Sequence, residues 1–266
     1  MKKVGLIAGG GLLPLEFIRA ARSDGQKVVV FAIRGQASPL LEKESDKLYQ
    51  MDVGEYKKFA FFLVKERIRR LALVGKVPKN IIYKNESYDK EGKEYLEKLR
   101  DKKDYSILEE ITKHLGKIGI EVISGMEYLA HLLPKKGVLT AMVPDERMKT
   151  DIVLGWNTAR KLAGMDIGQT VVVKNGTIVA VEAMEGTDAT ITRAHEIAGD
   201  GCVMVKVSRP NQDMRWDVPT VGPETIAGLV RNKFSALAIE NGRMFFVDKA
   251  RSLKAADAAG LVVEVM

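Results

Sequence analysis

Charged side chains of both signs gather in an irregular stretch that begins at Lys206 and ends at Thr225. It follows a short apolar run, Val203 to Val207, and holds three of the eight prolines, so neither a regular helix nor a central strand fits it. Its charged residues are Lys206, Arg209, Asp213, Arg215, Asp217 and Glu224. A proline-stiffened loop between a strand and a helix is a common position for chemistry, and a surface loop with ordinary ion pairs is the alternative.

The carboxylates favour a hard cation over zinc. Asp213 and Asp217 lie in this loop, and Asp188 follows another expected strand end, Ile178–Val181. Aspartate oxygens without paired histidine or cysteine suit Mg²⁺ or Mn²⁺, which can bridge phosphate oxygens and activate water. Helix caps and surface ion pairs are the alternative role for these acids, and Asp217 could be either a metal ligand or a general base.

A glycine cluster, Gly9-Gly10-Gly11, separates the first expected strand from the first expected helix. Such a turn lets a phosphate approach the backbone at a helix N-terminus. The cluster is not a dinucleotide fingerprint, because Pro14 stands where a third glycine would fall. Arg34 stands where a ribose-binding acid would be. The pattern therefore favours phosphate or nucleotide binding over NAD, and a tight turn that binds nothing is the alternative.

The elements around these residues predict an α/β protein of two domains. Strands expected at Lys3–Ala8, Lys27–Ile33, Leu71–Val74 and Glu121–Ile123 alternate with helices, including one over Glu55–Arg70 and one near Lys90–Lys102. This order predicts a Rossmann-like parallel sheet in residues 1–136. Residues 137–149 lack clear periodicity and are interpreted as a linker or exchanged arm.

Residues 150–266 are predicted to form a mixed α+β domain that carries the catalytic residues. Two Asn-Gly pairs, at Asn175 and Asn241, each predict a β-hairpin. Helices are expected over Thr150–Ala163 and Ala189–Ala198, with Thr187 or Asp188 as the N-cap of the latter.

The composition of the chain indicates which kinds of location and partner suit this protein. No apolar run is long enough for a membrane span, and the single cysteine, Cys202, excludes an internal disulfide, which fits the cytoplasm. Residues 1–136 carry 27 Lys+Arg and 19 Asp+Glu, a net +8, whereas the remainder carries 15 and 16, a net −1. The basic half suits nucleotides or a phospholipid surface, and the mixed-sign charge runs give nucleic acid little support.

Three motifs together resemble the LpxI family, the UDP-2,3-diacylglucosamine pyrophosphatases of lipid A synthesis. They are Gly-Gly-Gly-x-Leu-Pro at 9–14, Glu-Gly-Thr-Asp at 185–188 and the long Lys206–Thr225 segment. The resemblance implies two α/β domains with the substrate between them. It also implies metal-dependent hydrolysis to UMP and 2,3-diacylglucosamine 1-phosphate, with water attacking the α-phosphate and Asp217 essential. The family commonly has Phe at Trp216 and Ala-Lys at Ser208-Arg209.

The resulting hypothesis names catalytic residues Asp217, Asp213 and Arg215, and metal ligands Asp217, Asp213 and Asp188 for Mg²⁺ or Mn²⁺. The expected substrate-binding residues are Gly9, Gly10, Gly11, Leu13, Pro14, Arg34, Thr187, Lys206, Arg209, Gln212, Thr220, Val221 and Gly222. We expect a cytoplasmic protein that touches the inner face of the inner membrane peripherally, with a homodimer suggested by the arm after Gly137. The alternatives are a nucleotide-dependent oxidoreductase that uses the glycine turn, and a non-catalytic UDP-sugar-lipid binding protein.

Overall fold

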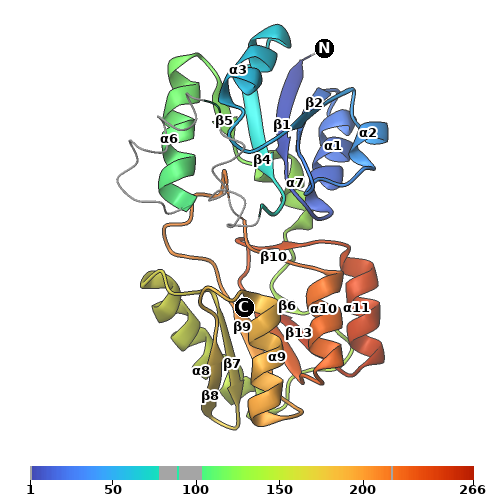
Figure 1. Ribbon diagram of the computed structural model, residues 1–266. Helices are drawn as coiled ribbons and strands as arrows, with labels where there is room; N and C mark the ends of the chain where they lie inside the picture. The colour runs from blue at the N-terminus through green and yellow to red at the C-terminus, as the bar shows by residue number, and fades with distance from the viewer. Residues whose placement is uncertain (1, 78–88, 90–103, 217) are drawn as a thin grey trace. The chain divides into compact units, whose positions relative to one another are not determined.

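The computed structural model describes residues 2–77, 89, 104–216 and 218–266. The chain divides into two compact units, which are described separately (Figure 1). The first unit contains the chain up to Ala130 and a short later segment that begins at Met214; the second contains the rest from His131. Both are built from sheets covered by helices, so the predicted α/β class is confirmed.

The first unit has a parallel sheet in the order β3-β2-β1-β4-β5 among its described residues. The strands are β1 (Lys3–Ala8), β2 (Lys27–Ile33), β3 (Lys47–Met51), β4 (Arg70–Val74) and β5 (Glu121–Ile123). The helices are α1 (Leu13–Ser23), α2 (Leu41–Glu44), α3 (Tyr56–Lys65), α6 (Asp104–Lys117) and α7 (Met126–Leu129), and the 3₁₀ helix η2 (Ala130–Leu132) spans the boundary between the two units. The strand order reverses at β1, where doubly wound folds bind their ligands.

Two sequence expectations differ from this unit. The edge strand β3 was not predicted, because Lys-Leu-Tyr-Gln-Met alternates polar and apolar residues over only five positions. The helix expected over Glu55–Arg70 ends at Lys65, since Arg67 adopts a positive φ of 55° that no helix can continue. The helix expected near Lys90–Lys102 lies outside the described residues.

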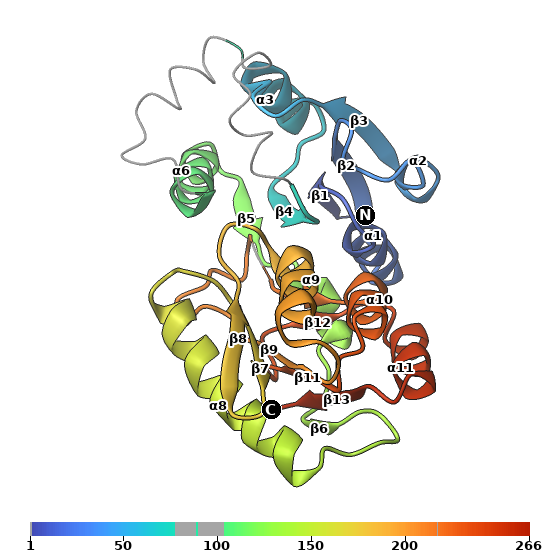
Figure 2. The same ribbon diagram turned by 60° about the horizontal axis from the view of Figure 1, so that its bottom comes forward.

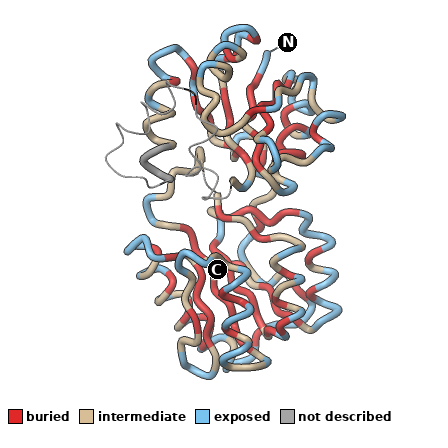
Figure 3. Tube along the Cα trace, viewed as in Figure 1, coloured by how far each residue is buried: buried red, intermediate tan, exposed pale blue. Residues whose placement is uncertain are grey.

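Helices cover both faces of the first sheet. Leu63 of α3 and Leu115 of α6 pack on a cluster that includes Phe31 and Leu71, while α1 and α7 pack together, with Phe17 edge-on to Tyr128 (Figure 1). The central strands β1 and β2 are among the most buried parts of this unit (Figure 3). The turn that follows β1 is held in place because β1 pairs with β2 and because most residues of β1 are buried under the helices.

A buried carboxylate ties the beginnings of β1 and β3 together. Glu66 is 6% exposed and accepts hydrogen bonds from Lys47 Nζ at 2.6 Å, Tyr49 Oη at 2.6 Å and Lys3 Nζ at 3.2 Å. The Lys47 ammonium, followed by the Tyr49 hydroxyl, lowers the pKa of Glu66 from 4.5 to about 2.

Glu66→Gln is therefore expected to lower the free energy of unfolding by about 2 kcal/mol at neutral pH. Because the folded pKa is depressed, this stabilisation is full above pH 4.5 and is lost as the pH falls toward 2. Urea unfolding across that range should show the difference between wild type and variant shrinking with acid. Glu110→Gln on the surface of α6 is the matched control and should change little; equal effects of the two variants would contradict the role of Glu66.

The second unit has a mixed sheet in the order β6-β13-β11-β9-β7-β8 among its described residues. Its strands are β6 (Gly137–Val138), β7 (Thr170–Lys174), β8 (Thr177–Val181), β9 (Val203–Lys206), β11 (Ala236–Ile239) and β13 (Val262–Val265), and β10 (Thr220–Val221) pairs separately with β12 (Phe245–Phe246). Its helices are α8 (Glu146–Gly164), α9 (Thr187–Ala198), α10 (Pro223–Arg231) and α11 (Lys249–Ala258).

The two faces of this sheet carry separate cores. Alternate residues such as Val171, Val205 and Ala238 pack with α8, whereas Met204 and Leu237 pack with α9, α10 and α11. Figure 2 shows α8 along one side of the sheet and the other three helices along the opposite side. No helix in the described part of the chain is both long and apolar enough to cross a membrane.

The first expected hairpin is confirmed and the second is wrong. β7 and β8 are antiparallel around Asn175 and Gly176, both with positive φ, and the buried Asp151 accepts both of their backbone N–H groups. By contrast, β11 before Asn241 pairs in parallel with β9 and β13. All four β11 residues are buried, so burial in the sheet centre decided the pairing over the local turn signal.

Residues 137–149, interpreted as a linker, contain regular structure at both ends. Gly137–Val138 form β6, which pairs antiparallel with β13. α8 begins at Glu146, capped by the Asp145 side chain, which accepts from Met148 N at 2.7 Å. The unpatterned arm that suggested a homodimer is therefore largely part of the second unit itself.

Candidate functional site

The glycine turn after β1 is closed by a second loop after β4. Gly9 N donates to Val74 O at 2.9 Å, and Gly10 and Lys76 exchange backbone hydrogen bonds at 2.8 and 3.0 Å. A Cβ on Gly9 would lie 2.7 Å from Lys76 O, and one on Gly75 would lie 2.8 Å from Gly10 O. Close approach of two loops therefore requires these glycines.

This closure changes which backbone groups a phosphate could use. The N–H groups of Gly9 and Gly10 already donate to backbone carbonyls. Gly11 has a φ of 88°, which favours glycine, and open space surrounds its Cβ position. An anion at this turn would therefore meet the backbone from Gly11 to Leu13, at the start of α1, where Pro14 has no N–H to offer.

Arg34, expected to contact a phosphate, forms an ion pair at the carboxyl end of β2. Its Nε lies 3.0 Å from Asp52 Oδ1, just after β3. Both side chains are substantially exposed, so this pair is weak and open to exchange with a phosphate. An acid thus does lie near the position where a dinucleotide fold places one, but it follows β3 and is paired with Arg34.

The irregular Lys206–Thr225 segment is anchored at its start by a buried network. Glu240 Oε2 accepts from Ser208 N and from Ser208 Oγ, each at 2.7 Å, and Glu240 Oε1 accepts from Arg160 Nη1 at 2.7 Å. Arg243 Nε donates to Ser208 Oγ at 2.6 Å, and Arg243 Nη2 donates to the carbonyls of Arg209 and Pro210. Glu240 and Ser208 are 6% and 1% exposed.

Two expected site residues meet directly at the end of β9. Lys206 Nζ donates to Thr187 Oγ1 at 3.0 Å, and Thr187 Oγ1 donates to Glu182 Oε1 at 2.8 Å. Thr187 is the first residue of α9, whose N-cap is Gly186 with a φ of 84°, so the expected N-cap at Thr187 or Asp188 is corrected. The hydroxyl is instead used to join the ends of two strands.

Arg209 and Gln212 form a local turn. Gln212 Oε1 accepts from Arg209 N at 3.0 Å, and Arg209 Nε lies 2.6 Å from Asp166 Oδ1. With its amide oxygen facing Arg209, Gln169 accepts from Arg209 Nη1 at 2.9 Å and donates to Val207 O at 3.2 Å. The guanidinium of Arg209 is therefore held by side chains of the same unit.

Thr220, Val221 and Gly222 lead into the N-terminus of α10. Thr220–Val221 form β10, and Gly222 is the N-cap ahead of Pro223. Val247 O lies 3.4 Å from a Cβ position on Gly222, so a larger residue fits there only tightly. The helix end directs free N–H groups and the positive end of its dipole toward any anion bound here.

The later segment of the first unit continues this loop. Ser124 Oγ donates to Met214 O at 2.7 Å, and Trp216 packs on the cluster beneath α3 and α6. The Arg215 guanidinium carbon lies 5.1 Å from the centroid of the Trp216 ring. Arg215, an expected catalytic residue, is therefore positioned by stacking on its neighbour.

The carboxylates expected to bind a metal are incompletely described. Asp217 lies outside the described residues, Asp213 is half-buried, and Asp188 is exposed in the first turn of α9. Within the described residues, no three His, Cys, Asp or Glu side chains form a metal-binding group. Glu185 has a structural role. Its own backbone N–H, followed by Arg193, lowers the pKa of its carboxyl group, so the carboxylate is already used within the protein.

Comparison with known proteins covers both units. The LpxI N-terminal domain model matches residues 3–132, and the LpxI C-terminal domain model matches residues 135–264. UDP-2,3-diacylglucosamine pyrophosphatase LpxI of Caulobacter vibrioides is 31% identical over 274 residues, covering 99% of this chain and 97% of that protein. The chain belongs to the LpxI family.

Two solved structures that resemble this chain have much lower sequence identity to it than the LpxI relative has. The biotin carboxylase domain of Hydrogenobacter thermophilus 2-oxoglutarate carboxylase aligns with a TM-score of 0.30 and 14% identity, over 74% of this chain and 41% of that one. N5-carboxyaminoimidazole synthetase from Staphylococcus aureus gives 0.28 and 16%, over 76% and 38%. The chain spans less than half the length of both, and such values carry no argument about function.

Several supporting residues of this LpxI family member were not predicted from its sequence. Glu240, Arg243 and Arg160 anchor the charged loop, and Lys76 closes the glycine turn. Each acts across a strand pairing or loop contact, so sequence spacing carries no signal for it. Glu240 had one available clue: a single acid directly after the apolar run Ala236–Ile239.

Proposed function

We propose that this protein hydrolyses the pyrophosphate bond of UDP-2,3-diacylglucosamine, giving UMP and 2,3-diacylglucosamine 1-phosphate. The observation that carries the proposal is the 31% identity over nearly the whole length to a relative named for that pyrophosphatase activity. The local chemistry supports it. In each unit taken by itself, a helix start offers backbone N–H groups that suit an anionic phosphate, α1 in the first unit and α10 in the second, and Arg215 of the first unit and Lys206 and Arg209 of the second are cations that suit the same group.

In the proposed mechanism, water attacks the α-phosphorus and the sugar 1-phosphate leaves. Lys206 and Arg215 offset the negative charge that develops on the phosphoryl oxygens, and the N–H groups around Gly222 add fixed dipoles. The Glu240–Ser208–Arg243 network holds the start of the loop, directly after Lys206, so this part of the protein does not reorganise during the reaction. Asp217 orients the attacking water or removes its proton.

A divalent cation, Mg²⁺ or Mn²⁺, is part of this proposal. Magnesium sites on phosphate substrates commonly use only one or two carboxylates, with phosphate oxygens and water completing the coordination. A donor set of Asp217 with Asp213 or Asp188 fits that pattern. It does not need three clustered acids, which do not occur among the described residues. The bound cation would neutralise phosphate charge and lower the pKa of coordinated water.

Hydrolysis in ¹⁸O-labelled water tests the reaction and its direction. The purified protein with Mg²⁺ is expected to release UMP that carries the label, because attack on the α-phosphorus leaves the new oxygen on UMP. EDTA should stop the reaction and added Mg²⁺ should restore it. Label in the sugar phosphate would mean attack on the β-phosphorus, and release of no UMP would favour a binding protein without catalysis.

The geometry of the glycine turn does not support the alternative of a nucleotide-dependent oxidoreductase. Gly9 and Gly10 use their N–H groups within the protein, and the acid near the ribose position is paired with Arg34. Peripheral contact with an anionic membrane surface remains part of the proposal, because the substrate carries two acyl chains.

A further inference from the structure

The amino edge of the first sheet is a separate chemical surface from the edge that carries the glycine turn. In a parallel sheet all strands begin at one edge and end at the other. Of the described strands of this unit, four begin with a cation, Lys3, Lys27, Lys47 and Arg70, and only β5 begins with an acid, Glu121. Cations thus begin most of the described strands at the edge opposite Gly9–Gly11.

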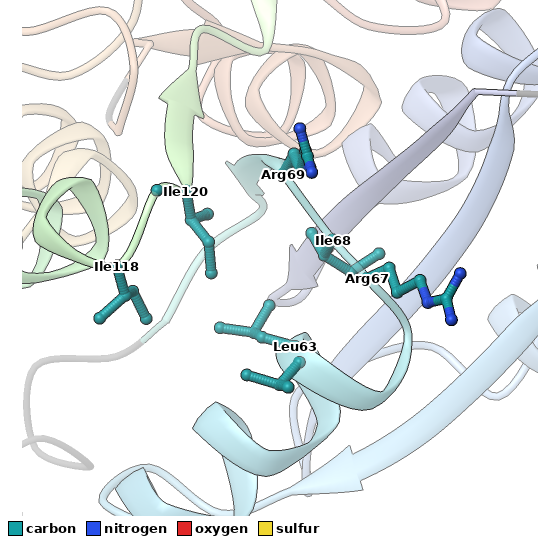
Figure 4. A pocket seen from close by; sticks show the side chains of 8 residues that line it. Leu63, Arg67, Ile68, Arg69, Ile118 and Ile120 are labelled. Carbon is teal, nitrogen blue, oxygen red and sulfur yellow. The ribbon is translucent and has the colours of Figure 1, made fainter.

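This edge also holds a pocket of about 400 Å³ between α3, the start of β4 and the turn before β5. Figure 4 shows the side chains of Leu63, Ile118 and Ile120 around a common space, with the guanidinium groups of Arg67 and Arg69 extending outward from it. Two arginines and no acid occur among the described residues that line it. The pocket is therefore apolar inside and cationic at its rim.

Large apolar side chains in and beside the pocket are exposed to solvent. Phe61 is 60% exposed, Val64 is 72% exposed and Ile118 is 49% exposed. Lys65 Nζ lies 5.8 Å from the ring centroids of Phe61 and Phe62. The Lys65 ammonium therefore shields these rings from solvent only in part. Exposed apolar groups clustered in this way mark interaction sites.

The nearby acids do not neutralise the arginines. Glu66 is enclosed by Lys3, Lys47 and Tyr49, and Glu121 lies 3.6 Å from Arg70. Neither Arg67 nor Arg69 forms an ion pair within the part of the chain that the structure describes. Both remain available to a partner that carries negative charge.

We propose that the patch formed by Phe61, Val64, Lys65, Arg67, Arg69 and Ile118 docks on the surface of an anionic membrane. Apolar side chains that enter the headgroup region, ringed by lysine and arginine, match the physics of interfacial binding to acidic lipids. The charge complementarity favours a lipid surface over a second copy of this chain, which would bring the same cations together. The inference extends the proposed function by naming the surface that contacts the membrane, and it is testable without turnover.

Vesicle co-sedimentation of the full chain, without substrate, tests the patch. Binding is expected to vesicles of equal parts phosphatidylcholine and phosphatidylglycerol, not to phosphatidylcholine alone, and should weaken as salt is raised. Arg67→Asn with Arg69→Gln should reduce the partition coefficient at least roughly tenfold; asparagine tolerates the positive φ at residue 67. Phe61→Ser with Val64→Ser should reduce it to a similar extent.

Matched substitutions in the second unit serve as controls. Arg251→Gln with Lys254→Gln removes the same charge from α11, and Ile197→Ser removes an exposed apolar side chain from α9; both should bind vesicles as wild type does. Hydrolysis of detergent-dispersed substrate should be unchanged in every patch variant, which separates docking from catalysis. Three results would overturn the proposal. Wild-type protein would fail to bind anionic vesicles, or the patch variants would bind them as well as wild type does. The third is a dimer, detected by light scattering, that the Phe61 and Val64 substitutions dissociate.

Discussion

Asp217→Asn is expected to lower kcat roughly 10²–10⁴-fold while leaving substrate binding largely intact. The change keeps the size of the side chain but removes the charge that a metal ligand or a general base requires. Steady-state kinetics on detergent-dispersed substrate measures kcat, and equilibrium binding measures affinity. Asp200→Asn makes the same chemical change in an exposed ion pair with Lys233 and should stay within about twofold of wild type.

The same variant distinguishes the two roles of Asp217. If Asp217 is the base, the acid limb of the wild-type profile of kcat/KM against pH reports its pKa and should vanish in the variant. If it is a metal ligand, the variant should instead require a much higher Mg²⁺ concentration for its residual activity. Wild-type kcat in a folded Asp217→Asn protein would exclude both roles and remove the residue from the proposed mechanism.

Glu240→Ala is expected to lower kcat/KM by about 10²-fold, although Glu240 is proposed to position the loop rather than to touch the substrate. The substitution leaves Ser208 N–H without its buried acceptor and breaks the contact to Arg160. An unsatisfied buried donor costs about 1–3 kcal/mol, so a shift of the loop that follows is the favoured response. Urea unfolding should show a loss of stability of about that size.

Graded variants separate positioning from simple destabilisation. Ser208→Ala keeps the backbone N–H bond to Glu240 and should lose less activity than Glu240→Ala, with Glu240→Gln between them. Glu196→Ala, an exposed acid on α9, is the matched control and should behave as wild type. The positioning role would be wrong if Glu240→Ala, at a temperature where it is fully folded, retained the wild-type kcat/KM.

Sequence patterns predicted the elements whose signal is local. Lys3–Ala8 and Lys27–Ile33 are apolar runs that could only be buried strands, and Asn175-Gly176 has the backbone geometry that its residue types favour. The strand β3 escaped notice because an edge strand needs only alternation. The turn signal at Asn241-Gly242 misled because β11 is stabilised by neighbours from distant parts of the chain.

The candidate site was predictable only as far as its chemistry resides in contiguous residues. The motif around Lys206–Thr225 named charged groups and a family, and the family membership is confirmed. The sequence offered no reason to pair Thr187 with Lys206 or Ser208 with Glu240, since those contacts depend on which strands lie side by side. The roles of Asp217, Asp213 and Asp188 stay predictions.

The placement of Met214–Trp216 in the first unit has a consequence for biosynthesis. The first 130 residues emerge from the ribosome long before Trp216 is synthesised. Trp216 nevertheless packs on the hydrophobic cluster of that unit, which includes Leu63 and Leu115. A nascent N-terminal unit would thus expose that part of its core until much of the second unit had been made. Truncation after residue 132, where the N-terminal family match ends, would make that exposure permanent.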